Sequence, residues 1–340
     1  MERHALDLPP AIAAMPRFDL TGGPSPLVEA PRLSAALGGG AAIWIKREDL
    51  LPLAFGGNKL RNLEFLVGEA LARRADTLIT SGRRWSNHCR LTAAAGARAG
   101  LGVHVVLTGP PVERAGVNER LDALLGATVH VAATDARGDR EALVDEVAAD
   151  VAAAGGRPYV IGVGGSSSSE GGAVGAVGQV VAGLELAAQA NAAGIPIDMV
   201  VLPTGTGGTH AGILTGLRLA GLVTRVLGVA VTAPPLELRA VVAGLLEALA
   251  PLAGIDAPLD AIELDGDQLG GGYGVPTAAA TEATALLART EGIFVDPIYT
   301  AKALAGLVAG VREGRLGGTI VFWHAGGTPA LFEATAPAQG

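Results

Sequence analysis

The sequence predicts an α/β fold in which parallel sheets carry helices on both faces, and three features support this prediction. From residue 43 onward, short β-branched runs alternate with longer runs rich in alanine and leucine. Many of the 50 glycines stand at the ends of apolar runs, where they indicate turns. The 340 residues are 49% hydrophobic, which provides a sizeable core for two domains or one large domain.

The alternation divides the chain into short strands and longer helices. The predicted strands are residues 43–45, 77–80, 103–107, 128–131, 159–163, 199–202, 226–231 and 319–323. The predicted helices are residues 60–73, 88–99, 113–125, 140–153, 175–190, 208–220, 236–252, 281–289 and 302–311. Ligands of such folds bind beyond the carboxyl ends of the strands, so we expect the chemistry at strand-to-helix turns.

Three segments interrupt the alternation. Residues 162–172 contain four consecutive serines and are a candidate hinge between two domains. Residues 255–276 are rich in glycine and aspartate and show little helical period. Residues 334–340 have the composition of a frayed tail.

Charge and composition argue against several classes of protein. The formal net charge is −8 and the basic residues are scattered, so a nucleic-acid partner is not expected. Cys89 is the one cysteine, which excludes an internal disulfide and a cysteine-based zinc site and suits a reducing cytoplasm. The N-terminal segment lacks the apolar core of a signal peptide, and no run reaches the roughly 20 apolar residues of a membrane span. We therefore expect a soluble, cytoplasmic protein.

Lys59 is the most informative candidate for chemistry. Two glycines and an asparagine, residues 56–58, precede it at the start of a predicted helix. The positive end of the helix dipole disfavours a protonated lysine there. An easily deprotonated lysine can act as a nucleophile or form a Schiff base, whereas an ordinary solvated lysine is the alternative.

A glycine-rich turn between the strand at 199–202 and the next helix is a candidate anion site. It comprises Thr204, Gly205, Thr206, Gly207, Gly208 and Thr209. Converging backbone N–H groups and the helix dipole would attract an anion. The turn lacks the lysine of a P-loop and the spacing of the dinucleotide fingerprint, so a single small phosphate fits better. A simple tight turn is the alternative.

Other turns hold polar residues whose ordinary roles are structural. Ser86 or Asn87 is a natural N-cap for the helix that follows, and a substrate carboxylate is the functional alternative. Tyr273 and Tyr299 follow loops, where a phenol can donate a proton or simply meet a backbone carbonyl. His324 reads as a buried, hydrogen-bonded histidine, and no set of histidines has metal-ligand spacing, so no metal is predicted.

Taken in order, these motifs resemble those of the fold-type II pyridoxal-phosphate enzymes. The closest resemblance is to the family of D-cysteine desulfhydrase and 1-aminocyclopropane-1-carboxylate deaminase. It spans about residues 20–333 and rests on residues 26–27, 45–49, 56–59, 63–64, 86–88, 204–209, 272–276, 296–299 and 324–327. The resemblance implies a large cofactor domain, residues 1–50 plus 165–340, and a small domain, residues 51–164, with the active site between them.

The resemblance also implies roles for individual residues. Lys59 would hold pyridoxal 5′-phosphate as a Schiff base and move protons at the substrate Cα, while the 204–209 turn would hold the phosphate. Asn87 would contact the cofactor ring hydroxyl, and Ser86 and its neighbours would bind the substrate carboxylate, with Ser86 assisting proton transfer. Further cofactor contacts would come from Asn58, Tyr299 and Thr300. Tyr273 and Tyr299 would be catalytic residues. Further substrate contacts would come from Arg84, Trp85, His88, Ala325 and Gly326.

Departures from the family pattern bear on the reaction and the substrate. Thr300 stands where the deaminases typically carry glutamate, and a neutral hydroxyl cannot keep the pyridine nitrogen protonated. Ala325 stands where they typically carry leucine, and both differences favour a β-eliminase.

Arg84 and Trp85, preceded by Arg83, replace an apolar residue and glutamine. A guanidinium there would select an acidic substrate such as cysteate or a larger one, whereas solvent-facing arginines are the alternative, favoured for Arg83.

The sequence therefore predicts β-elimination on a small amino acid, with D-cysteine giving pyruvate, hydrogen sulfide and ammonia. Alternatives on the same cofactor are a cysteate sulfo-lyase, a cyclopropane deaminase, a racemase and a β-replacement enzyme. A non-catalytic ligand-binding protein is the alternative from another class. A homodimer is expected from the resemblance.

Overall fold

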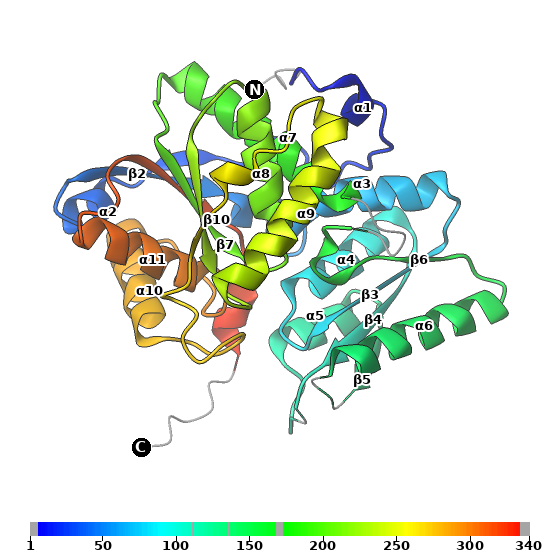
Figure 1. Cartoon of the computed structure of the whole chain (residues 1–340). Helices are drawn as coiled ribbons and strands as arrows, with labels where there is room; N and C mark the ends of the chain where they lie inside the picture. Colours follow the sequence, from blue (N-terminus) through cyan, green and yellow to red (C-terminus); the bar gives the residue numbers. More distant parts are fainter. Residues whose placement is uncertain (1–5, 111, 133, 135, 168–172, 334–340) are drawn as a thin grey trace.

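Two sheets lie side by side in the computed structural model, which describes residues 6–110, 112–132, 134, 136–167 and 173–333 (Figure 1). The six-stranded sheet has the order β1-β2-β10-β7-β8-β9, and the four-stranded sheet has the order β5-β4-β3-β6. Neighbouring strands run parallel except β1, which is antiparallel to β2. The strands are β1 Leu27–Glu29, β2 Ala41–Arg47, β3 Thr77–Arg83, β4 Gly102–Thr108, β5 Thr128–Ala132, β6 Pro158–Val160, β7 Met199–Thr204, β8 Arg225–Ala230, β9 Glu263–Asp265 and β10 Gly318–His324.

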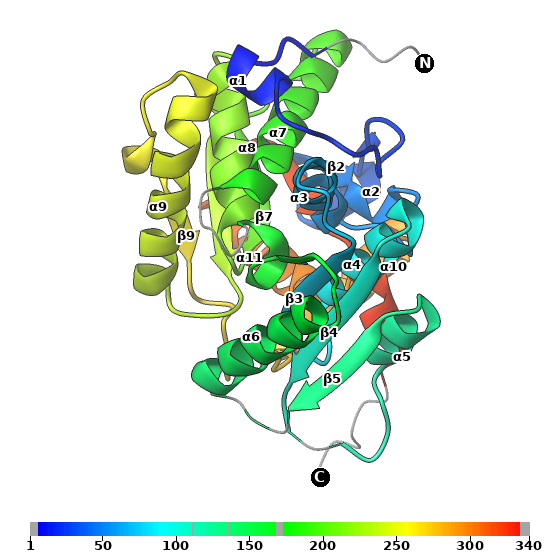
Figure 2. The same ribbon diagram turned by 90° about the vertical axis from the view of Figure 1, so that its right-hand side faces the viewer.

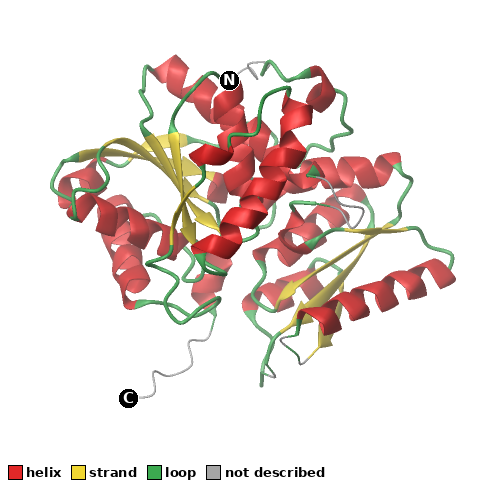
Figure 3. Ribbon diagram, in the orientation of Figure 1, coloured by secondary structure: helices red, strands yellow, loops and turns green. Residues whose placement is uncertain are grey.

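Helices enclose both sheets (Figure 3). The α-helices are α1 Pro10–Ala13, α2 Pro31–Ala36, α3 Lys59–Ala72, α4 Asn87–Ala99, α5 Val117–Leu124, α6 Arg137–Ala153, α7 Val174–Ala193, α8 Gly208–Leu219, α9 Pro235–Ala253, α10 Ala278–Glu291 and α11 Thr300–Arg312. Short 3-10 helices occur at η1 Glu48–Leu50, η2 Val163–Gly165, η3 Leu259–Ala261 and η4 Thr328–Phe332. No helix among the described residues is long and apolar enough to cross a membrane.

The predicted α/β alternation is confirmed, with differences at the shortest elements. The sequence missed β1, β9, α1 and α2, which are three to six residues long and show no full period. The strand predicted at 159–163 ends at Val160, and the helix predicted from residue 113 begins at Val117. Part of the predicted hinge, residues 168–172, and the tail at 334–340 lie outside the described residues.

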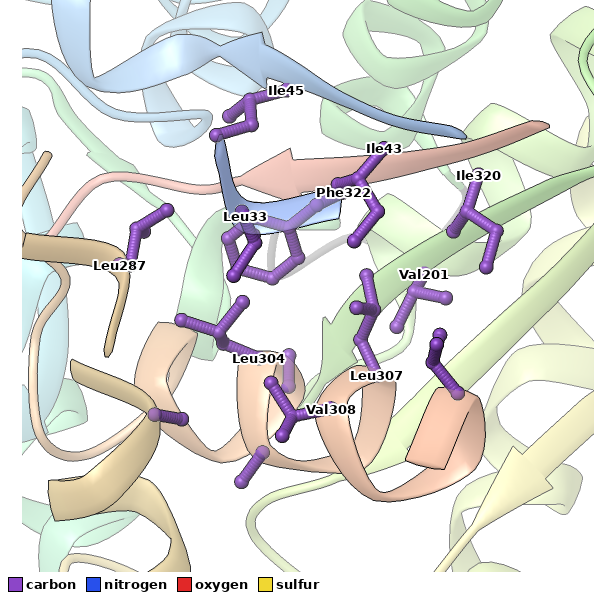
Figure 4. Packing of buried hydrophobic residues seen from close by; sticks show 14 of the residues in the cluster. Leu33, Ile43, Ile45, Val201, Leu287, Leu304, Leu307, Val308, Ile320 and Phe322 are labelled. Atoms are coloured by element: carbon purple, nitrogen blue, oxygen red, sulfur yellow. The ribbon is translucent and has the colours of Figure 1, made fainter. Parts of the chain in front are cut away.

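Each sheet is covered on both faces by apolar side chains. On one face of the large sheet, Phe322 and Ile43 pack against Leu304 of α11, together with residues of α2 and α10 (Figure 4). Residues of α7, α8 and α9 pack on its other face around Trp323. In the small sheet, α3 and α4 cover one face and α6 covers the other (Figure 2). Burial on both faces explains why the strands read as continuous apolar runs.

A buried ion cluster joins α3 to the large sheet. The guanidinium of Arg61, which is 1% exposed, donates to Glu48 at 2.8 and 2.9 Å and to Glu185 at 2.6 and 2.8 Å. The ammonium group of Lys46 lies 2.5 Å from Glu185. Because Arg61 is two residues from Lys59, this cluster fixes the helix that begins with the candidate lysine. The domain boundaries stay a prediction, since α3 packs against both α7 and α4.

Candidate active site

A cavity is lined by residues that follow the carboxyl ends of β3, β7, β8 and β10, so it is lined from both sheets. This is the place expected for a ligand in such a fold. Most of the predicted site residues line it. They are Asn58, Lys59, Ser86, Asn87, His88, Thr204, Gly205, Thr206, Gly207, Thr209, Tyr273, Tyr299, Thr300, Ala325 and Gly326.

The loop before Lys59 is held by hydrogen bonds from three directions. The backbone N–H of Asn58 donates to the carbonyl of Ala325 at 3.0 Å, and its side-chain amide donates to Thr209 Oγ1 at 2.8 Å. The amide of Gln179 donates to the Asn58 carbonyl at 2.8 Å. The lysine is therefore placed between the segment after β10 and the glycine-rich turn after β7.

Two glycines permit this arrangement. A Cβ added to Gly326 would lie 2.6 Å from the Cα of Gly57, and a Cβ on Gly57 would lie 3.3 Å from the carbonyl oxygen of Ala325. Both residues also have positive φ, at +99° and +128°. Only glycine at both positions allows the two backbones to approach this closely.

Lys59 is the first residue of α3, as predicted, and is partly accessible from the cavity. Burial lowers the pKa of its ammonium group to about 8. The pKa is lowered, as expected, but the cause is desolvation by burial rather than the helix dipole. A substantial fraction of this lysine is therefore a neutral amine near pH 8.

The turn from Thr204 to Thr209, called the cradle below, meets the cavity at the N-terminus of α8. It follows β7 and leads into α8, whose first N–H groups have no partner within the helix. Gly207 has φ +77° at the N-cap, and a Cβ on Gly208 would lie 2.9 Å from the Cβ of Ser166. Gly208 itself belongs to the turn but not to the cavity lining.

Ser86 and His88 occupy the turn between β3 and α4. Ser86 is the N-cap of α4 and its Oγ accepts from the N–H of Cys89 at 3.2 Å, so the structural role is present. The hydroxyl keeps its own hydrogen and also lines the cavity. The Nε2 of His88 lies 2.9 Å from Thr80 Oγ1, and burial, with the charge of Lys59, lowers its pKa to about 3. His88 is thus neutral at physiological pH.

Tyr273 and Tyr299 meet each other rather than backbone carbonyls. Their hydroxyl groups are hydrogen bonded to each other, and the ring centroids are 5.8 Å apart. Burial raises the pKa of both phenols. Both are therefore protonated at neutral pH, and because one hydroxyl donates to the other, one O–H hydrogen of the pair remains to donate into the cavity.

Thr300 and Asp296 lie at the start of α11, on the cavity wall. The Asp296 carboxylate accepts from the N–H groups of Ile298, Tyr299 and Thr300 at 3.0, 2.7 and 2.9 Å. The hydroxyl of Thr300 lies within hydrogen-bond distance of two acceptors, the Asp296 carboxylate and the carbonyl of Gly326, which share its one hydrogen. Asp296 was not predicted as a wall residue, although Asp-Pro before a predicted helix is a signal for a turn.

The arginines are arranged differently from the expectation. Arg84 pairs with Glu119 at 3.0 Å, and neither Arg84 nor Trp85 is in the cavity lining. Arg83, whose side chain was expected to face solvent, lines the cavity instead. Arg140 of α6 also lines it. Trp85 packs edge-on against Tyr273, with ring centroids 5.8 Å apart.

These features define a pyridoxal-phosphate enzyme, and the comparison with known families agrees. The family model described as "Pyridoxal-phosphate dependent enzyme" matches residues 18–326, and the chain belongs to this family. It is 42% identical over 326 residues to a D-cysteine desulfhydrase of Salmonella newport, covering 94% of this chain and 97% of that protein. The D-cysteine desulfhydrase of Salmonella choleraesuis is 43% identical with the same coverage.

Solved structures confirm the fold. The crystal structure of an ACC deaminase homologue superimposes with a TM-score of 0.86 at 34% identity and covers 95% of each chain. The processed form of threonine deaminase isoform 2 from Solanum lycopersicum matches with a TM-score of 0.66 at 20% identity, over 93% of this chain and 87% of that one. At this lower identity the second match supports the shared fold alone.

The residues present fit pyridoxal phosphate. The cradle after β7 offers backbone amides to one phosphate, and Lys59 offers an amine to an aldehyde. Among the described residues no group of three or more histidine, cysteine, aspartate or glutamate side chains is placed to hold a metal ion.

Proposed function

We propose that this chain is a lyase that carries out β-elimination on a small β-substituted amino acid, with D-cysteine as the substrate. D-cysteine and water would give pyruvate, hydrogen sulfide and ammonia. One observation carries the proposal: a lysine whose pKa is lowered to about 8 stands beside a cradle for a single phosphate. The 42% identity to D-cysteine desulfhydrases supports the choice of reaction.

Pyridoxal phosphate, when bound, supplies an electron sink for the carbanion that forms at the substrate Cα. Lys59 would hold the cofactor and, once released from it, accept the α-proton. Asn58 and the 204–209 turn would position the phosphate group of the cofactor. Tyr299 and Thr300 would contact its ring, where Thr300 offers a neutral hydroxyl rather than a carboxylate.

The substrate would lie on the side of the cavity formed by the turn after β3. Ser86, Asn87 and His88 would bind its carboxylate through the Ser86 hydroxyl and the backbone amides that begin α4, which leaves the side-chain amide of Asn87 to contact the ring oxygen of the cofactor. The neutral phenol pair Tyr273 and Tyr299 would donate a hydrogen bond to the departing sulfur. Ala325 and Gly326 would form the opposite wall.

A product screen of the purified protein tests the proposal. With D-cysteine we expect pyruvate and sulfide in equal amounts, and Lys59→Ala should abolish both because it removes the base. Sulfite from cysteate would identify a sulfo-lyase, and 2-oxobutanoate from 1-aminocyclopropane-1-carboxylate a deaminase. Exchange of the α-proton without elimination would indicate a racemase. The D-cysteine proposal is wrong if neither pyruvate nor sulfide forms.

Cysteate is a second candidate substrate, favoured by one observation. Arg83, at the end of β3, and Arg140, on α6, line the cavity from two elements. A sulfonate on the β-carbon would be attracted to these guanidinium groups. If Arg140→Gln reduces kcat/KM for cysteate far more than for D-cysteine, the arginines select the anion. Equal loss for both would remove this candidate.

A homodimer in the cytoplasm is also proposed, with the domain division at residues 50/51 and 164/165. The single cysteine, Cys89, is fully buried and burial raises its pKa, which suits a thiol that is not recruited for a disulfide. Light scattering of the purified protein tests the dimer. A mass equal to one chain would contradict it.

A further inference from the structure

We propose that Arg90 is a positioning residue, which fixes the amide of Asn87 so that its Nδ2 donates to the ring oxygen of pyridoxal phosphate. The inference rests on the proposed placement of the cofactor ring beside Asn87. It concerns a fully buried residue of α4 that is not itself in the cavity lining.

Arg90 contacts three acceptors that surround the site. Its Nη1 donates to Asn87 Oδ1 at 2.9 Å and to Asn118 Oδ1 at 2.7 Å. Its Nη2 donates to the carbonyl of Gly56 at 3.3 Å, in the loop that leads to Lys59. One planar guanidinium therefore joins the start of α4, the start of α5 and the lysine loop.

These contacts determine which way the Asn87 amide points. Its Oδ1 accepts from Arg90 and also lies 3.3 Å from the Nδ2 of Asn118. Asn118 is held in turn, since its Nδ2 donates to the Trp85 carbonyl at 2.9 Å. A reversed Asn87 amide would set its own N–H groups against these donors, so the orientation with Oδ1 toward Arg90 is favoured.

The opposite end of the amide is thereby turned toward the cavity. The Nδ2 of Asn87 lies 2.8 Å from the position that a Cβ on Gly327 would occupy, and both residues line the cavity. A larger residue at position 327 would meet this nitrogen. The donor that remains available on Asn87 is therefore held at the cavity wall after β10.

Arg90 keeps its charge in this buried place. Burial lowers its pKa to about 10, which is still well above neutral pH. Its neighbour Asp122 is also fully buried, and burial raises the pKa of that carboxyl group to about 8. At neutral pH the guanidinium is protonated, so Nη1 and Nη2 both donate and the orientation of Asn87 is maintained.

The test uses the visible absorption of the bound cofactor and its dissociation constant, measured by titrating apoprotein with pyridoxal phosphate. A donor to the ring oxygen favours its anionic form, so loss of the donor should shift the absorption band. For Arg90→Met and for Asn87→Ala we expect the same band shift and about a tenfold higher dissociation constant. The double variant should be no worse than Asn87→Ala alone.

Two further variants separate positioning from general destabilisation. Arg218 donates to the carbonyls of Leu222 and Thr224 at 2.7 and 3.2 Å, so Arg218→Met removes another arginine tied to backbone oxygens but should leave the band unchanged. Arg90→Lys keeps the charge but loses the planar fork, and should shift the band partway even if Arg90→Met does not fold.

The inference is overturned if Arg90→Met, or Arg90→Lys where only that variant folds, keeps the wild-type band and dissociation constant. It is also overturned if the effects of Arg90→Met and Asn87→Ala add, because independent effects would mean that Arg90 does not act through Asn87. A wild-type protein that binds no pyridoxal phosphate would instead overturn the proposed function, and the inference with it.

Discussion

Replacing Arg61 by methionine should strongly destabilise the protein, because it breaks a buried cluster that is electrically balanced. The cluster holds two cations, Arg61 and Lys46, and two carboxylates, Glu48 and Glu185. Arg61 makes four hydrogen bonds to these carboxylates and a fifth to Ser25 Oγ at 3.2 Å. Without it, Glu185 keeps Lys46, whereas Glu48 retains only the hydroxyl of Ser25.

The expected cost follows from this imbalance. Glu48 is fully buried, so Arg61→Met leaves one carboxylate without a compensating charge. Removing one partner of a buried ion pair costs about 3–5 kcal/mol, a large share of the ~5–15 kcal/mol that stabilises a typical protein. Urea unfolding of the apoprotein, followed by circular dichroism, measures the loss. Because an unpaired buried carboxyl has a raised pKa, the loss should shrink as the pH falls toward 5.

Two companion variants test the reasoning. Arg225 makes a 2.6 Å ion pair with Glu263 on the surface, so Arg225→Met should cost less than about 1 kcal/mol. Adding Glu48→Gln to Arg61→Met should recover part of the stability, since it removes the uncompensated charge. The reasoning fails if Arg61→Met costs no more than Arg225→Met, or if the double variant is no more stable than Arg61→Met.

Three further outcomes are expected. Apoprotein with Lys59→Met should be more stable than wild type below pH 8, because burial lowers the lysine pKa to about 8 and disfavours its charge; thermal unfolding should show this advantage shrinking between pH 8 and 10.5. Gly326→Ala should weaken cofactor binding, measured by titration, because its Cβ would lie 2.6 Å from the Cα of Gly57; unchanged affinity would contradict the close contact. Ser86→Ala should cost about 1 kcal/mol through loss of the N-cap and should also lower kcat, whereas Ser86→Thr should restore the cap.

The sequence predicted the longer helices and strands and the turns between them. It did not predict which of two adjacent side chains faces the cavity. Arg83 is the last residue of β3 and lines the cavity, whereas Arg84 turns to Glu119. Successive residues of an extended chain point to opposite sides, and nothing in the sequence tells which side faces the ligand. Arg84 was predicted to contact the substrate, but the arginine that lines the cavity is its neighbour, Arg83.

Long-range partners were harder still. Arg140 reaches the cavity from α6, and its helix carries no motif that singles it out. Arg90 and Asn118 are 28 positions apart and meet only because α4 packs against α5. For Lys59 the position was predictable from the glycines before it, whereas the burial that lowers its pKa depends on the packed structure around it.

The contact between Gly57 and Gly326 has a consequence for how the family can vary. It joins two backbones with no side chain between them, so there is no complementary shape that a second substitution could adjust. A large residue in a core can be accommodated by shrinking its neighbour, but here the neighbour is already glycine. In a suppressor screen of Gly326→Ala we therefore expect reversion at position 326 and no rescue at position 57. These two positions should remain fixed together even where the surrounding walls change to accept other substrates.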